Sequence, residues 1–138
     1  MTKTGKLRMV NTPMGIKINL KGFHLSSFNH TDLMRDINDS LAPFRKAQPN
    51  AMAGFGQLAK AAITDGALSG KQKELIAVSI AVTQGCSGCI GFHVKALVQL
   101  GCTRAELEET LSVCVYMGGG PALMYSAEVI AAWDKLSA

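Results

Sequence analysis

The residues best suited to carry chemistry lie between Gly85 and His93, where two cysteines and a histidine recur at helical spacing. Cys86, Cys89 and His93 stand at i, i+3 and i+7, which brings their side chains within roughly 60° of one another on a helix. Because helical side chains lean towards the N-terminus, His93 leans back over Cys89, and Cys89 leans towards Cys86. We therefore expect two thiols and an imidazole in a row on one helix face.

The two cysteines come at the start of that helix, where unpaired backbone N–H groups and the helix dipole favour a thiolate. A free thiol with a pKa near 8.5 is only about 3% thiolate at pH 7, whereas a pKa of roughly 6.5 makes it about 75% thiolate. Proximity to His93 favours Cys89 as the nucleophile with Cys86 resolving, and this is our choice. The helix dipole taken alone favours Cys86, so the order of attack stays open.

Glu74 is expected to face this row from the preceding helix. If the two helices form an antiparallel hairpin about Gly85, Glu74 comes within about one helical turn of His93. A carboxylate in a largely apolar helix needs a partner, and His93 is the nearest suitable one. A proton could then pass along Glu74, His93, Cys89 and Cys86, directly or through a water. The alternative is a surface Glu74 on the first turn of its helix.

The two cysteines have two other interpretations, an inert buried pair and a zinc site. Two buried apolar cysteines would be inert, and C-x-x-C with a histidine can supply three zinc ligands. On one continuous helix, however, Cys86 and His93 are separated by about 10 Å of rise. Zinc ligands must all lie about 2–2.3 Å from one point, so we expect no metal and no bound cofactor. Cys102 and Cys114 are predicted to be structural.

The elements that must position these residues are helices. From about residue 31 the chain indicates six of them, with no convincing strand after residue 25. Caps and prolines begin them at Thr31, Pro49, the Ser69–Gln72 capping box, Ser87, the Thr103–Glu106 capping box and Pro121. Breakers end them at Pro43, which ends or restarts the first, and at Asp65-Gly66, Gly85, Gly101 and Gly118-Gly119-Gly120.

Length and charge agree with one helical domain. The 138 residues suit a single domain, which we place at residues 26–138. Residues 1–25 form a basic, partly irregular N-terminal segment, with a short extended stretch within 8–22. The first 31 residues hold five basic residues and no acidic one, which is more typical of a solvated tail than of a nucleic-acid surface. No stretch has the length of a membrane span or the form of a secretory signal, so we expect a cytoplasmic protein. In that compartment cysteines are more often free, catalytic or metal-binding than structural bridges.

The spacing of Glu74, Cys86-x-x-Cys89 and His93 resembles the alkyl hydroperoxidase D-like branch of the carboxymuconolactone decarboxylase superfamily. The resemblance covers roughly residues 45–135 and includes the later Gly-Gly-Gly-Pro stretch. It implies an all-α bundle in which the reduced Cys86–Cys89 pair reduces peroxides in antioxidant defence and is itself oxidised reversibly to a disulfide. It also implies re-reduction by a thiol donor, either a lipoylated or a thioredoxin-like protein.

One position departs from that pattern. Members of the hydroperoxidase D type often carry a second histidine just before the second cysteine, and here that position is Gly88, which cannot relay a proton. A non-enzymatic redox-sensing protein is therefore an alternative function. A lactone enzyme of the carboxymuconolactone decarboxylase type is another, although the retained cysteine pair argues against it.

An oligomer is expected from the apolar surface. The run from Leu75 to Val82 is apolar nearly all round, and a small bundle has difficulty covering it from one chain. The last helix adds further apolar residues that could meet a neighbour. Obligate interfaces resemble a domain core cut in half, so we expect a homo-oligomer. The resemblance implies a hexamer.

Overall fold

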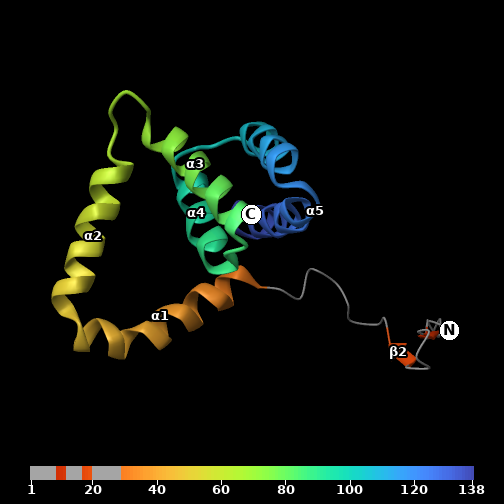
Figure 1. Cartoon of the computed structure of the whole chain (residues 1–138), viewed down its shortest axis with the longest axis horizontal. Helices are drawn as coiled ribbons and strands as arrows, with labels where there is room; N and C mark the ends of the chain where they lie inside the picture. The colour runs from red at the N-terminus through yellow and green to blue at the C-terminus, as the bar shows by residue number, and fades with distance from the viewer. Residues whose placement is uncertain (1–8, 12–16, 20–28) are drawn as a thin grey trace.

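The computed structural model of the chain describes two short strands near the N-terminus and all residues from 29 to 138 (Figure 1). β1 (Met9–Asn11) and β2 (Lys17–Asn19) pair antiparallel, with Met9 opposite Asn19. This pairing confirms the short extended stretch expected within residues 8–22. The other residues of the expected segment 1–25 lie outside the described residues, so that segment and its boundary stay predictions.

From residue 29 onwards the described chain is all-α, as predicted. The helices are α1 (His30–Ala47), α2 (Pro49–Ile63), α3 (Gly70–Gln84), α4 (Ser87–Gln99) and α5 (Arg104–Leu136). The capping boxes and the helix-ending glycine predicted from the sequence are found at the expected residues. Both capping boxes form, at Ser69–Gln72 and Thr103–Glu106, and Gly85 ends α3 in the left-handed region. None of the described helices is long and apolar enough to cross a membrane.

The prediction of six helices is wrong, because residues 29–138 form five. The expected fifth and sixth helices run through the glycine triplet as one helical element, α5, in which only Gly119 leaves helical geometry, at φ 65° and ψ −150°. The chain still changes direction there. Arg104 at the start of α5 forms an ion pair with Asp134 near its end, so the two halves lie side by side. Pro121 follows this bend by two residues, at the start of the second half of α5, where a proline is well tolerated.

Two expectations about the first helix are also corrected. Its cap is Asn29 rather than Thr31, since the Asn29 side chain accepts a hydrogen bond from the Thr31 N–H at 3.1 Å. Pro43 does not end the helix, which continues to Ala47. The Arg45 guanidinium reaches back past the proline and donates to the Asn38 carbonyl at 3.2 Å, which stabilises this irregular turn.

The core lies between α3, α4 and α5, each of which packs on the other two. Its largest fully buried apolar side chains are Val78, Val82, Ile90, Val94, Leu97, Leu107 and Val129. At one end Lys71 of α3 binds Glu106 of α5 at 2.6 Å. The hydrogen bond from Lys71, together with those from Thr103, lowers the pKa of Glu106 to about 2. This contact ties the first turn of α3 to the first turn of α5.

Helices α1 and α2 extend away from this core as an arm (Figure 1). Only His30 and Met34 of α1 are buried, and α2 has no buried residue. The buried end of α1 packs on α4 and reaches α5, where His30 Nε2 lies 3.7 Å from Glu128 Oε2. Burial lowers the pKa of His30, and the nearby Glu128 carboxylate opposes that shift. The arm is therefore attached to the core mainly at its first two turns.

The bend in α5 predicts a difference between two neighbouring glycines. Gly119→Ala should lower the free energy of unfolding by about 1–3 kcal/mol, because its backbone lies in a region that is strained for any residue with a Cβ. Gly120→Ala is the matched control, since neither position has another atom within 4 Å of an added Cβ and only Gly119 has a positive φ. Urea denaturation at one fixed protein concentration measures both. Equal effects of the two substitutions would contradict the strain at Gly119.

Candidate active site

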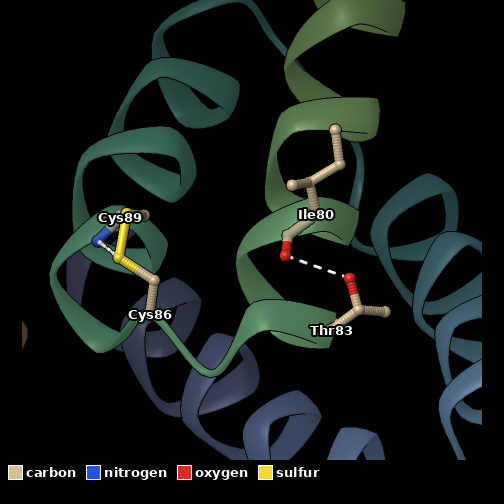
Figure 2. The surroundings of a disulfide bond; sticks show 4 residues. All are labelled: Ile80, Thr83, Cys86 and Cys89. Carbon is tan, nitrogen blue, oxygen red and sulfur yellow. Dashed lines mark hydrogen bonds between the residues drawn. A yellow bond between two sulfur atoms is a disulfide. The ribbon is translucent and has the colours of Figure 1, made fainter.

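Cys86 and Cys89 are joined by a disulfide at the start of α4, with their Cα atoms 5.3 Å apart (Figure 2). Cys86 is the N-cap residue of α4, and its Sγ accepts a hydrogen bond from the Cys89 N–H at 3.3 Å. Both cysteines are half-buried rather than enclosed. The same N–H would stabilise a thiolate on Cys86 after reduction, because it lies at the positive end of the helix dipole.

The second part of the site is the pair formed by Glu74 and His93. Glu74 of α3 is 6% exposed, and its Oε2 lies 2.7 Å from His93 Nδ1 on α4. The structure therefore places Glu74 in the core against His93 and not on the surface. When Nδ1–H donates to the carboxylate, Nε2 is left as the acceptor of the neutral imidazole. His93 is about one-third exposed and one helical turn from Cys89.

The turn that carries Cys86 is held from two sides. The Cys86 N–H donates to the Ala81 carbonyl of α3 at 2.9 Å, which fixes the hairpin expected about Gly85. Tyr125 of α5 packs against the same turn, since a Cβ added to Gly85 would lie 3.0 Å from the Tyr125 Oη. Sequence reasoning missed Tyr125, because nothing in the local pattern of α5 indicates which turn its ring reaches.

Helix α1 also reaches the site, which the sequence did not predict. A Cβ on Gly88 would lie 2.7 Å from Ile37 Cδ1, and one on Gly91 would lie 3.1 Å from Met34 Cγ. Glycines three residues apart therefore form the face of α4 on which α1 packs closely. That spacing is the signal that could have indicated a helix contact here. A side chain at Gly88 would require the end of the Ile37 side chain to move, so the glycine suits the close approach of α1.

The remaining cysteines lie away from this constellation. Cys102 and Cys114 are buried and free, in agreement with the structural positions expected for them. Burial raises the pKa of Cys102, which lowers its reactivity. Among residues 29–138 and the two strands, no three His, Cys, Asp or Glu side chains are grouped so that they could hold a metal ion.

Comparison with known proteins finds a matching family and a similar sequence. The model of the carboxymuconolactone decarboxylase family matches residues 49–132. An uncharacterized protein of Cupriavidus necator is 41% identical over 111 residues, which cover 78% of this chain and 98% of that protein.

Two solved structures are similar as well. A carboxymuconolactone decarboxylase family protein from Legionella pneumophila is 53% identical, with a TM-score of 0.77 over 79% of this chain and 97% of that one. A family member from Thermotoga maritima, for which a role in the antioxidative response has been suggested, is 26% identical. Its TM-score is 0.59 over 62% of this chain and 89% of that one.

The contact between Glu74 and His93 predicts how the reduced cysteines react. His93→Ala and Glu74→Gln should each slow alkylation of the reactive cysteine by roughly 10-fold at pH 7. The first removes the imidazole that takes up the thiol proton, and the second removes the carboxylate charge that stabilises the imidazolium. The pH at which alkylation reaches half its maximal rate should rise in both variants. Iodoacetamide labelling of the pre-reduced protein, followed by peptide mass spectrometry, measures Cys86 and Cys89 separately.

Glu109→Gln is the control for this measurement, since it makes the same chemical change at an exposed position on α5. It should leave the labelling rates unchanged. Glu74→Gln keeps an acceptor for the Nδ1–H and removes only the charge, so it separates geometry from electrostatics. Alkylation profiles identical to the wild type in both site variants would exclude the pair from thiolate formation.

Proposed function

The chain belongs to the carboxymuconolactone decarboxylase family, and on that premise we propose that it is a thiol-dependent peroxidase and disulfide oxidoreductase. Cys86 and Cys89 are its redox pair, and His93 and Glu74 are the residues that move the proton. The observation that carries the proposal is the disulfide at a helix start with a buried carboxylate–imidazole pair one turn away. Perturbed or paired titratable groups beside a nucleophile are typical of catalytic sites.

The oxidative half of the cycle uses both cysteines. The Cys89 thiolate attacks one oxygen of the peroxide, the O–O bond breaks, and the alcohol or water leaves with a proton. Cys89 is then a sulfenic acid. The Cys86 thiolate attacks its sulfur, the S–O bond breaks, and hydroxide leaves as water after taking up a proton. The product is the Cys86–Cys89 disulfide that the structure contains.

His93 and Glu74 act on the proton in this scheme. Nε2 of His93 accepts the proton of Cys89 and returns it to the departing oxygen, while Glu74 holds Nδ1–H and stabilises the imidazolium. The proton passes between Cys89 and His93 directly or through a water. Gly88 supplies no second relay, which leaves His93 as the single base of the row.

A thiol donor must return two electrons to the disulfide in each turnover. By resemblance the donor is a lipoylated or thioredoxin-like protein, and the setting is antioxidant defence in the cytoplasm. The suggested antioxidative role of the Thermotoga maritima relative supports this direction. A shared fold does not determine which reaction a protein catalyses. The test must therefore measure the redox reactions of the cysteines.

Steady-state turnover tests the proposal. The wild-type protein should consume an alkyl hydroperoxide continuously in the presence of a dithiol, and Cys86→Ser and Cys89→Ser should each lower the rate at least 100-fold, because each removes one half of the disulfide cycle. Cys114→Ser is the matched control and should keep activity. Oxidation that stops after one equivalent identifies a redox sensor instead, and lactone decarboxylation retained in the Cys86→Ser/Cys89→Ser variant identifies a lactone enzyme.

We also propose that the chain works as a homo-oligomer, with a hexamer as the number that the resemblance suggests. The arm supports this proposal. Phe55 and Leu58 of α2 are both about two-thirds exposed, and α2 buries nothing within its own chain. Ile76 and Ile80 on the outer face of α3 are about half exposed. Apolar surfaces of this kind mark protein interfaces, and identical chains usually close into symmetric assemblies.

Light scattering at micromolar concentration tests the assembly. The wild type should have a multiple of the 14.6 kDa mass of one chain, six in the case of a hexamer. Phe55→Glu/Leu58→Glu should lower that mass, because it places charge in the interface. Lys60→Glu, a charge change on the same helix, is the control. A wild-type mass near that of one chain would refute the assembly.

A further inference from the structure

The turn from α3 into α4 has the same backbone geometry as the turn that ends α4. Gly85 and Gly101 both lie in the left-handed region, at φ 68° and 69°. In each turn the N–H of the cysteine that follows the glycine donates to a carbonyl five residues back, at 2.9 Å for Cys86 and at 3.0 Å for Cys102. A glycine in this conformation commonly ends a helix. The two turns are therefore equivalent in their backbone, and only the first carries a cysteine of the disulfide.

The two turns differ in what covers the glycine. A Cβ added to Gly85 would lie 3.0 Å from both Cζ and Oη of Tyr125, whereas one added to Gly101 would meet nothing within 4 Å beyond its neighbours in the chain. Tyr125 comes from the second half of α5, where it is half-buried and packs against the core. Because glycine has no side chain, Gly85 leaves free the space in which this ring lies. The turn that carries Cys86 is therefore a contact among three helices.

Of the two redox cysteines, Cys86 depends more on this turn. Cys89 lies within α4 and has the regular backbone of a helix. Cys86 is the N-cap residue, with a non-helical backbone at φ −99° and ψ 86°, and Figure 2 shows it at the point where the turn meets α4. For the disulfide to close, the sulfur of Cys86 must reach that of Cys89, and a misplacement of about 1 Å can lower a rate on the order of 100-fold.

We propose that Tyr125 is a positioning residue of the redox pair, which keeps Cys86 within reach of Cys89 while the disulfide is open. This inference rests on the proposed function and adds a residue that acts on the sulfurs through the backbone of Gly85. In the oxidised protein the S–S bond itself restrains the turn. In the reduced protein that restraint falls to the hydrogen bond of the Cys86 N–H and to the Tyr125 ring. A turn that is already restrained loses less conformational entropy when the disulfide closes, so closure is more favourable.

Exchange with glutathione measures this restraint in the full chain. One cysteine thiolate attacks oxidised glutathione and displaces a glutathione thiolate, and the other cysteine thiolate then attacks the mixed disulfide and displaces the second. The protein loses two electrons, its disulfide forms, and two molecules of reduced glutathione are released. The equilibrium constant of this reaction is obtained by alkylating the free thiols across a series of glutathione ratios and measuring the label on Cys86 and Cys89 by mass spectrometry.

Variants of the two tyrosines of the chain test the role of the ring. Tyr125→Leu should lower the equilibrium constant about 10-fold, because the shorter side chain no longer restrains the turn, and Tyr125→Phe should stay within about 2-fold of the wild type, because it keeps the ring. Tyr116→Leu is the matched control, since it makes the same change on α5 at a position that is 84% exposed, and it should leave the constant unchanged. Urea denaturation of the oxidised variants checks that each is folded, and Tyr125→Met replaces Tyr125→Leu if that variant is not.

The two equivalent glycines give an independent test of the same contact. Gly85→Ala and Gly101→Ala introduce the same strain of a positive φ, but only the first brings a Cβ against Tyr125. Gly85→Ala should lower the equilibrium constant about 10-fold, and Gly101→Ala should not change it. In the Tyr125→Leu protein, Gly85→Ala should have a smaller effect, because the ring no longer opposes the added Cβ.

The outcomes distinguish this inference from the proposed function. If the wild type forms no Cys86–Cys89 disulfide with glutathione, the proposed redox cycle itself fails. If the disulfide forms but Tyr125→Leu keeps the wild-type constant, Tyr125 does not position Cys86 and the cycle stands. An equal loss in Tyr125→Phe and Tyr125→Leu, or an equal effect of Gly85→Ala with and without the ring, also overturns the role of the ring.

Discussion

The buried carboxylate of Glu74 is the constraint on which the site depends. A charged group in an apolar helix is costly unless it has a partner, and Glu74 finds one in His93 at 2.7 Å. This contact fixes the register of α3 against α4 and the orientation of the imidazole. The turn at Gly85 fixes the same register from the other end, through the bond from Cys86 N–H to the Ala81 carbonyl. Between these two points the cysteines have little freedom to move relative to His93.

Gly88 shows how packing and chemistry compete at one position. A Cβ at this position would point towards α1 and would require the end of the Ile37 side chain to move. In this chain the position serves the close approach of two helices. Proton transfer at the cysteines is therefore left to the imidazole of His93 on the same helix.

The parts that could be predicted from the sequence are those set by neighbouring residues. Capping boxes, the left-handed glycine at the end of α3 and the spacing of Cys86, Cys89 and His93 all act within a few residues, and so does the hairpin that carries Glu74 to His93. What the sequence missed depends on distant segments. The packing of Tyr125 on Gly85 is a tertiary contact with no local signature, and the spacing of Gly88 and Gly91 indicates a helix contact without identifying α1 as the partner. The helix count failed for a related reason. The glycine triplet bends the helical element at Gly119, and a distant contact, the ion pair of Arg104 with Asp134, holds the two halves of α5 together.

The arm is the part of the fold that the core supports least. Its inner end is held by His30 and Met34, whereas α2 has no buried residue and an isolated helix of that length is marginal in water. In the proposed assembly, a second copy lying on Phe55 and Leu58 would remove their apolar surface from water and so support α2. The bundle of α3, α4 and α5 meanwhile holds the disulfide and the Glu74–His93 pair in place.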